Sequence, residues 1–200
     1  MALYKGKYRV QSTRLPCWDY ATAGWYFVTI CTFDRKPFFG WVSGDKMRLS
    51  PVGKTAHRFW QEIPDHFPHV NLDEFIVMPN HVHGIVLIDG DGDTSIRIGD
   101  TTAIETRHVA SLHLHKHSHN PIMPKFGPLK KGSLSKIIQA YKSAVTRWAR
   151  RDANVEFAWQ TRFYDHIIRD DRSLLRIQRY IQDNPMGWVQ DRHNPANLFM

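Results

Sequence analysis

The chain of 200 residues contains only two cysteines, Cys17 and Cys31. Two cysteines are too few for a disulfide framework, and they lack the spacing of a cysteine metal site. No apolar run is long enough to cross a bilayer, and the first residues lack the apolar stretch of a signal peptide. These absences argue against a disulfide-rich secreted protein and against a membrane protein. We therefore expect reduced cysteines and a cytoplasmic location.

The formal net charge of +8 is unevenly distributed along the chain. Residues 125–192 carry 14 Lys and Arg against 7 Asp and Glu, whereas residues 71–110 carry 2 against 7. A basic C-terminal half is the electrostatic pattern expected for binding a polyanion such as nucleic acid. Many soluble proteins are mildly basic, so charge alone favours this class only modestly.

Hydrophobic periodicity and turn residues predict alternating strands and helices. The expected strands cover residues 25–33, 70–78, 81–88 and 157–168, and the expected helices cover residues 51–66, 133–148 and 170–184. Pro79-Asn80 reads as a tight turn, Ser133 as a helix cap, and Asp170 or Asp171 as the start of the last helix, which closes at Asn184-Pro185. The order β-α-β-β-α-β-α predicts an α+β ferredoxin-like sandwich with an antiparallel sheet and a C-terminal helix.

We expect one domain over residues 1–200, interrupted by a flexible insertion at residues 89–132. The insertion begins with Asp89-Gly90-Asp91-Gly92-Asp93 and ends among prolines. Alternating histidines within residues 108–119 could bind Zn²⁺ or Ni²⁺, although a solvated loop is the favoured interpretation. The histidines concerned are His113, His115, His117 and His119.

His81-Val82-His83 lies in the apolar run of residues 75–88. Alternate side chains of a strand point to the same face, so the two imidazoles can hold one metal ion. The ordinary alternative is a pair of histidines on the polar face of a strand. Taken alone, the motif favours neither interpretation.

Tyr180 and Asn184 are four residues apart in the last expected helix and therefore share one of its faces. Ile177 and Ile181 would lie on a neighbouring, buried face. A phenol beside an amide oxygen is a possible pairing of a nucleophile with a metal ligand. The alternative, favoured for these residues alone, is a core tyrosine and an asparagine that caps the helix C-terminus.

The two pairs together point to one reaction. A metal ion held by His81, His83 and Asn184 would polarise a phosphodiester, and Tyr180 would attack the phosphorus to form a phosphotyrosine and release a 3′-hydroxyl. Such a donor set suits Mn²⁺ or Mg²⁺, and Zn²⁺ equally by ligand number. Because a free phenol has a pKa of about 10, Tyr180 would need the metal or a cation, for which Lys142 and Arg179 are candidates.

Other residues carry weaker signals. Tyr141 is a rival nucleophile, although its helical spacing favours core packing, and Tyr164 has no ligand at a useful offset. Tryptophans 18, 148, 159 and 188 could stack on unpaired bases or pack in the core. The candidate DNA-binding residues are Lys142, Arg147, Arg150, Arg151, Arg162, His166 and Arg179. For the arginines at 147–151, stabilisation of the helix dipole is as good an explanation.

The chain resembles the single-tyrosine HUH transposases, specifically the REP-associated tyrosine transposases and their insertion-sequence relatives. Four segments carry the resemblance, in the family's order: residues 77–83, the helix of residues 134–147 with Lys142-Ser143, residues 159–169, and residues 180–185. The resemblance implies that His81, His83 and Asn184 bind Mg²⁺ or Mn²⁺ and that Tyr180 is the nucleophile. It also implies cleavage and rejoining of single-stranded DNA next to small hairpins.

Two features depart from the family's pattern: the segment of residues 89–132 is longer, and the tail after Pro185 is shorter. The leading hypothesis is a metal-dependent strand transferase that acts beside the nucleoid DNA. A catalytically silent hairpin-binding regulator is the alternative, and a phosphoesterase in which water attacks is a third. The sequence does not decide between a monomer and a homodimer.

Overall fold

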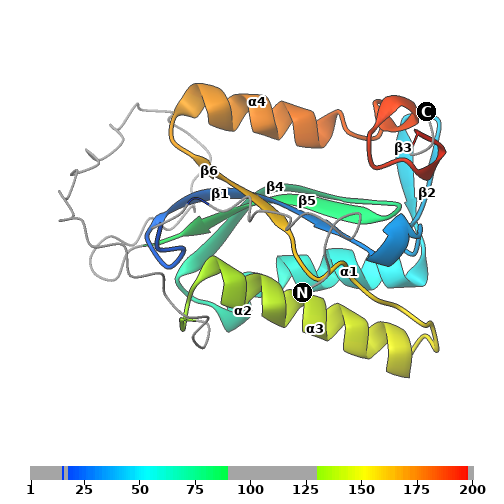
Figure 1. Ribbon diagram of the computed structural model, residues 1–200, viewed down its shortest axis with the longest axis horizontal. Coiled ribbons are helices and arrows are strands. Elements are labelled where there is room, and N and C mark those ends of the chain that lie inside the picture. Colours follow the sequence, from blue (N-terminus) through cyan, green and yellow to red (C-terminus); the bar gives the residue numbers. More distant parts are fainter. Residues whose placement is uncertain (1–14, 16–17, 90–129, 198–200) are drawn as a thin grey trace, which may run out of the picture. The chain divides into compact units, whose positions relative to one another are not determined.

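The computed structural model describes residues 15, 18–89 and 130–197, which belong to one unit formed by residues 1–91 and 129–200. Its centre is an antiparallel four-stranded sheet with the order β4-β5-β1-β6 (Figure 1). The strands are β1 (Gly24–Cys31), β4 (Val70–Met78), β5 (His81–Ile88) and β6 (Tyr164–Ile168). The predicted α+β fold with an antiparallel sheet is confirmed.

Helices cover both faces of this sheet. On one side lie α1 (Pro51–Gln61), α2 (Ile63–His66) and α3 (Leu134–Arg151), and on the other lies α4 (Asp171–Gln182) (Figure 1). The larger core fills the α1/α3 side, and a smaller one, built on Phe27, Ile85, Ile168 and Ile181, lies beneath α4. Because both faces are covered, β5 is buried almost along its whole length, which explains its continuous apolar sequence.

Alternation along the two central strands assigns each side chain to a layer. Val28 and Val82 belong to the larger core, whereas Phe27 and Ile85 belong to the smaller one. His81 and His83 share the parity of Ile85, so they face the α4 side. The turn at Pro79-Asn80 that joins β4 to β5 forms as predicted.

The predicted helix over residues 51–66 divides at Glu62 into α1 and α2. Pro64 has no N–H to continue the hydrogen-bond ladder and restricts the residue before it, so the helix is interrupted. The start of α1 is well specified, because the Ser50 hydroxyl accepts a hydrogen bond from the Gly53 N–H at 3.1 Å and Pro51 occupies the first turn.

The strands differ from the prediction in two places. Of the predicted strand over residues 157–168 only β6 forms, and Trp159 makes an isolated bridge to Thr32. Before β6 begins, the Lys142 ammonium donates hydrogen bonds to the backbone carbonyls of Gln160 and Thr161, at 2.6 and 3.4 Å. The hairpin of β2 (Gly40–Ser43) and β3 (Lys46–Leu49) was not predicted, because four-residue strands carry too little periodicity.

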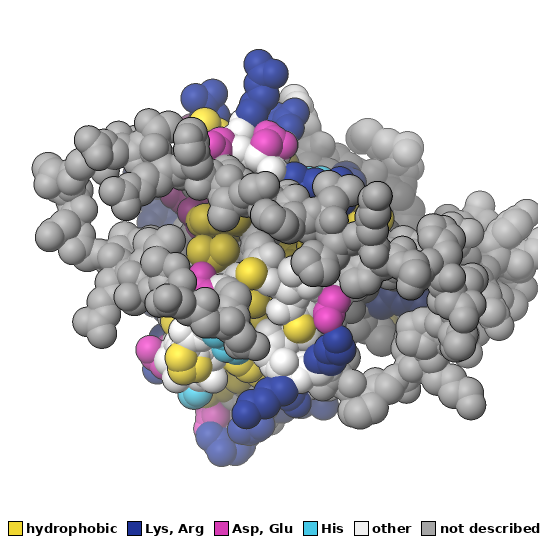
Figure 2. All heavy atoms as spheres, turned by 90° about the vertical axis from the view of Figure 1, so that its left-hand side faces the viewer, with side chains coloured by type: hydrophobic (Ala, Val, Ile, Leu, Met, Phe, Trp, Pro, Cys, Tyr) yellow, Lys and Arg dark blue, Asp and Glu magenta, His cyan; other side chains and the backbone are white. Residues whose placement is uncertain are grey.

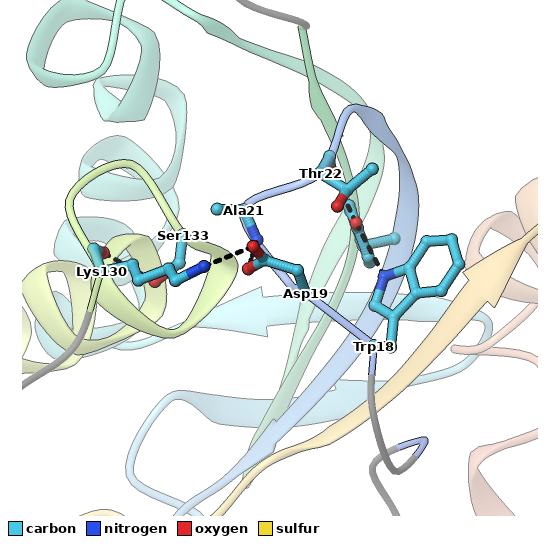
Figure 3. A network of polar contacts seen from close by, with 7 residues as sticks. Trp18, Asp19, Ala21, Thr22, Lys130 and Ser133 are labelled. Atoms are coloured by element: carbon cyan, nitrogen blue, oxygen red, sulfur yellow. Dashed lines mark hydrogen bonds and ion pairs between the residues drawn. The ribbon is translucent and has the colours of Figure 1, made fainter. Parts of the chain in front are cut away.

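The start of α3 is anchored to the segment that leads into β1 (Figure 3). Lys130 pairs with the Asp19 carboxylate at 2.5 Å, and that carboxylate also accepts from the Ala21 N–H. Ser133 is the N-cap residue, as predicted, but its hydroxyl donates to the Lys130 carbonyl instead of accepting from the helix. The start of α3 is therefore held by the contacts of Lys130 with Asp19 and Ser133, and not by the Ser133 side-chain cap that the sequence indicated.

The C-terminal part follows the prediction more closely. Asp170 caps α4 by accepting from the Ser173 N–H at 2.8 Å. After α4 the chain forms two short 3₁₀ turns, Trp188–Gln190 and Pro195–Asn197, and a third lies earlier at Phe33–Arg35. None of the helices in the described ranges has the length and apolarity to span a membrane. Cys17, most of the predicted insertion and its four alternating histidines lie outside the described residues.

Candidate active site

His81 and His83 project from the start of β5, a central strand of the sheet. His81 pairs with Cys31 of β1 and Met78 of β4, and His83 pairs with Thr29 and Ile76. Both imidazoles are fully buried, and their ring centroids lie 4.4 Å apart. Pairing on both sides of the strand holds the two histidines in fixed positions.

Helix α4 lies over this face of the sheet. Ile181 packs into the smaller core, while Gln178 and Gln182 donate hydrogen bonds to Asp73 at 2.8 Å and Glu74 at 2.9 Å. These two carboxylates occur where the β4–β5 register shifts, between Leu72 and Phe75. A bulge of this kind re-aims side chains at a sheet edge, and here it supplies the acceptors that fix the position of α4.

Tyr180 extends from α4 to the second histidine. Its hydroxyl lies 3.2 Å from Nε2 of His83, and its ring meets Phe27 edge-on with centroids 6.2 Å apart. Phe27 in turn stacks on His83 at 5.4 Å. Tyr180 is 43% exposed, so part of the residue remains accessible to an incoming ligand.

Asn184 follows the C-terminal end of α4 and is buried, with 5% exposure. Its side chain makes a hydrogen bond to Tyr180 that lowers the pKa of the phenol, so the amide N–H group is the donor. Its Oδ1 has no partner, and neither has Nε2 of His81. The four residues predicted as the site are therefore brought together on one face; their catalytic and metal-binding roles remain predictions.

Burial controls the protonation of these groups. Desolvation lowers the pKa of His81 well below its ordinary value and that of His83 to about 3, so both imidazoles are neutral near pH 7. Desolvation also raises the pKa of Tyr180, in spite of the opposing hydrogen bond from Asn184. The phenol is consequently protonated at neutral pH and must lose its proton to become a nucleophile.

The donors present fit a divalent cation. Two buried polar atoms without a hydrogen-bond partner, on His81 and Asn184, are costly unless something binds them. Among the residues that the structure describes, no three His, Cys, Asp or Glu side chains form a metal-binding group. A three-residue protein site would therefore need the Asn184 amide oxygen beside the two histidines, a donor set suited to Mn²⁺ or Mg²⁺.

Sequence reasoning missed His193. This buried residue from the tail after α4 places its ring 4.7 Å from that of His81, and its Nδ1 lies 3.7 Å from the Cys31 thiol. Burial lowers the pKa of His193 to about 4. A single histidine outside any periodic segment gives no signal in the sequence, so only the folded tail identifies it.

The candidate DNA-binding residues are not gathered in one place. Lys142, Arg147, Arg150 and Arg151 belong to α3, on the sheet face opposite the histidines, while Arg179 and His166 lie on α4 and β6, with Arg162 just before β6. Arg150 donates to the Phe157 carbonyl, and Arg151 pairs with Asp152. In the view of Figure 2, Lys and Arg side chains are visible at both the upper and the lower margin of this face.

The remaining aromatic candidates are either packed in the core or exposed near the histidines. Tyr141 is buried and donates to the Ala56 carbonyl at 3.1 Å, so its predicted core role is confirmed. Tyr164 is exposed on the same sheet face as His83 and contacts the edge of Phe27. Three of the tryptophans pack against the larger core, and the ring of Trp188 lies 6.0 Å from that of His81.

Comparison with known proteins adds independent information. No family model matches the chain. An uncharacterised protein of Haemophilus influenzae is 34% identical over 187 residues, covering 94% of each chain. A second protein of that organism, provisionally named a REP-associated tyrosine transposase, is 25% identical over 175 residues, covering 86% of this chain and 77% of its own.

A solved structure shares the fold. It is a REP-associated tyrosine transposase bound to a REP hairpin, with a TM-score of 0.52, 16% sequence identity and coverage of 88% of this chain and 76% of its own. The family resemblance read from the sequence is thus confirmed by a related sequence and by a shared fold. The chain is therefore similar in sequence to a protein named as a REP-associated tyrosine transposase and shares the fold of another.

Proposed function

We propose that the protein is a metal-dependent DNA strand transferase that cleaves single-stranded DNA through a 5′-phosphotyrosine at Tyr180. The observation that carries the proposal is the contact of 3.2 Å between the Tyr180 hydroxyl and Nε2 of His83. Beside it lie two buried atoms without a hydrogen-bond partner, Nε2 of His81 and Oδ1 of Asn184. If the cluster had only a structural role, we would expect these two atoms to have hydrogen-bond partners within the protein.

The chemistry exchanges one phosphate ester for another. The Tyr180 oxygen forms a bond to phosphorus, and the bond from phosphorus to the 3′ oxygen of the neighbouring nucleotide breaks. The phenol gives up a proton and the departing oxygen takes one up, leaving a 3′-hydroxyl and a tyrosyl phosphodiester. Because the ester bond is conserved, the reverse attack by a 3′-hydroxyl rejoins DNA without ATP.

The other residues of the site would orient the phenol or bind the metal ion. Phe27 and the hydrogen bond from Asn184 orient the phenol, and the latter stabilises its deprotonated form. His81, His83 and Asn184 would hold Mg²⁺ or Mn²⁺, which when bound supplies charge stabilisation to the phosphodiester. The Lys142 ammonium donates hydrogen bonds to the carbonyls of Gln160 and Thr161, so it is not available to activate the phenol.

The partner that fits best is single-stranded DNA next to a hairpin. A relative by fold is bound to a REP hairpin, and the present chain carries a net charge of +8, which suits a nucleic acid. Residues 1–200 would act as a single domain, in the cytoplasm beside the nucleoid DNA.

The test uses end-labelled hairpin DNA with single-stranded flanks, incubated with Mn²⁺ and the intact protein. The wild-type protein is expected to form an adduct that survives denaturation and to release a shorter strand. Tyr180→Phe, which keeps the ring on Phe27, should lose both products and still bind DNA. Tyr164→Phe is the matched control and should retain both.

Two other results would each overturn the proposal. Hairpin binding by the wild-type protein without any cleavage would indicate a silent regulatory binder. Cleavage that persists in Tyr180→Phe would indicate attack by water, with Tyr180 only positioning the substrate.

A further inference from the structure

Asn80, the last residue of the turn before His81, is buried and contacts three separate segments. Its Nδ2 lies 2.9 Å from the Arg35 carbonyl and 2.8 Å from the His193 carbonyl. Carbonyl oxygens only accept, so this end of the amide must be the NH₂ group. The opposite end is consequently the oxygen, and the orientation of the amide is fixed by its surroundings.

That oxygen determines the tautomer of His81. Oδ1 of Asn80 lies 2.9 Å from Nδ1 of His81. Because an amide oxygen only accepts, Nδ1 must carry the proton, and a neutral imidazole then has its lone pair on Nε2. Nε2 is the buried atom without a partner, so the lone pair is held ready inside the site.

A second buried residue contacts Nδ1 of His83. The Thr29 hydroxyl, on the adjacent strand β1, lies 2.9 Å from Nδ1 of His83, and the Tyr180 hydroxyl lies 3.2 Å from its Nε2. Asn184 already donates to the phenolic oxygen. In the Nδ1–H tautomer of His83, the phenol donates to Nε2 and Nδ1 donates to the Thr29 hydroxyl, which gives a chain from Tyr180 through His83 to Thr29.

We infer that Asn80 and Thr29 are positioning residues that hold both imidazoles as Nδ1–H tautomers, with the two Nε2 lone pairs directed to a shared cation. This inference rests on the metal site of the proposed function. Outer-shell partners of metal-binding histidines commonly fix ring orientation in this way, and their loss costs about 10- to 100-fold in metal affinity.

The first measurement is made without metal. In protein labelled with ¹⁵N-histidine, long-range ¹⁵N–¹H spectra distinguish protonated from unprotonated ring nitrogens, and His81→Gln and His83→Gln assign the signals. We expect protonated Nδ1 and unprotonated Nε2 on both rings. A proton on Nε2 of His81 in the wild-type protein would overturn the inference, because Asn80 would then not control the ring.

The second measurement is Mn²⁺ affinity by calorimetry. Thr29→Val keeps the shape and removes the hydroxyl, and it should weaken Mn²⁺ binding about 10- to 100-fold, with the His83 signals redistributed between tautomers. Thr29→Ser should restore both, whereas Thr55→Val, a buried threonine of α1, should change neither. Asn80→Ala should affect His81 in the same manner as Thr29→Val affects His83.

The outcomes separate the two proposals. Unchanged tautomers and unchanged Mn²⁺ affinity in both Thr29→Val and Asn80→Ala would overturn the positioning role. Wild-type protein with the expected tautomers and no Mn²⁺ binding would instead overturn the metal site of the proposed function.

A different observation concerns the β2–β3 hairpin. Trp41 is 62% exposed, and Arg48 lies directly opposite it, with Lys46 exposed on the same face. The opposite face of the hairpin packs Met47 and Leu49 against the larger core. An exposed indole beside two cations of the neighbouring strand is a platform on which an unpaired base can stack while its phosphates meet the cations.

The base of the hairpin is hydrogen-bonded to the turn that precedes His81. The Phe39 N–H, at its base, donates to the Pro79 carbonyl at 2.9 Å, in the turn before His81. In Figure 1 this hairpin lies at the same end of the sheet as the C-terminal end of α4. We propose that Trp41, Lys46 and Arg48 bind a nucleotide of the single-stranded flank of the DNA substrate.

The test uses Tyr180→Phe protein, which cannot cleave, and fluorescent hairpin DNA with or without single-stranded flanks. Adding Trp41→Ala should weaken binding of flanked hairpins between about fivefold and a hundredfold and leave flankless hairpins unaffected. Leu175→Ala, an exposed apolar residue of α4, is the control. Equal binding by the Trp41→Ala protein would overturn this assignment, whereas no hairpin binding by any variant would count against the proposed function itself.

Discussion

At the scale of single residues, Nε2 of His83 is the atom on which the account turns. In the inferred Nδ1–H tautomer it has one lone pair, which accepts from the Tyr180 hydroxyl 3.2 Å away. An imidazole nitrogen that binds a cation cannot also accept a hydrogen bond. Tyr180 must therefore release His83 when the site is loaded, which frees the phenolic oxygen for the substrate.

This competition predicts the effect of Tyr180→Phe on metal binding. Removal of the hydroxyl should leave Mn²⁺ affinity equal to that of the wild-type protein or up to about tenfold tighter, since one neutral hydrogen bond contributes about 0.5–1.5 kcal/mol. Titration calorimetry of the metal-free protein measures the affinity, with His81→Gln as the weakened reference. A tenfold loss in Tyr180→Phe would instead make Tyr180 itself a ligand.

At the scale of elements, β5 is held against α1 by a close approach of backbone to ring. A Cβ added at Gly84 would lie 2.3 Å from Cζ2 of Trp60, whose ring is fully buried. Glycine is therefore required beside His83 for packing, independently of any turn. The same strand thus carries the two histidines on one face and a close packing contact with α1 on the other.

Gly84→Ala should consequently destabilise the fold by about 1–3 kcal/mol, the usual cost of overpacking a core. Urea unfolding measures the change in the free energy of unfolding. Gly187→Ala, where the nearest atom to an added Cβ is 3.7 Å away, is the control and should change it little. Equal stability of both variants would contradict the packing argument.

The position of α4 gives a second prediction at this scale. Gln178 and Gln182 tie the helix to the carboxylates of Asp73 and Glu74. Replacing both glutamines by alanine should slow adduct formation severalfold, because each bond contributes roughly 0.5–1.5 kcal/mol to the placement of Tyr180. Far-UV circular dichroism should be unchanged, and Gln61→Ala on α1 serves as the control. An unchanged rate in the double variant would show that the core contacts alone position α4.

Much of this arrangement was predictable from local patterns. Strand alternation placed His81 and His83 on one face, and the spacing of four placed Tyr180 beside Asn184. Asn80 and Thr29 were not identified as functional, because their importance depends on pairing between β1 and β5 and on a tail residue 113 positions away. The β2–β3 hairpin was missed because its four-residue strands depend on packing against the core for their existence.

At the scale of the whole molecule, the basic residues of the described ranges lie in both layers of helices. A net charge of +8 spread in this way should attract DNA over a broad surface. Each phosphate that a single strand contacts lowers the logarithm of affinity by about 0.7 per decade of salt, and by about 0.9 for a duplex.

Hairpin binding should therefore weaken with salt along a log–log slope steeper than about −2, which corresponds to three or more phosphate contacts. Fluorescence anisotropy of Tyr180→Phe protein measures the slope. Arg147→Ala should reduce its magnitude by about 0.7–0.9 if Arg147 contacts a phosphate, whereas Arg151→Ala should not, because Arg151 is already paired with Asp152. A flat salt dependence would contradict an electrostatic DNA interface.

The most direct test of the central claim is mass spectrometry of the protein–DNA adduct. After incubation with hairpin DNA and Mn²⁺, nuclease and protease digestion should leave a nucleotide phosphate on the peptide that contains Tyr180 and on no other peptide. A modified Tyr164 peptide, or cleaved DNA without any modified tyrosine, would contradict the account.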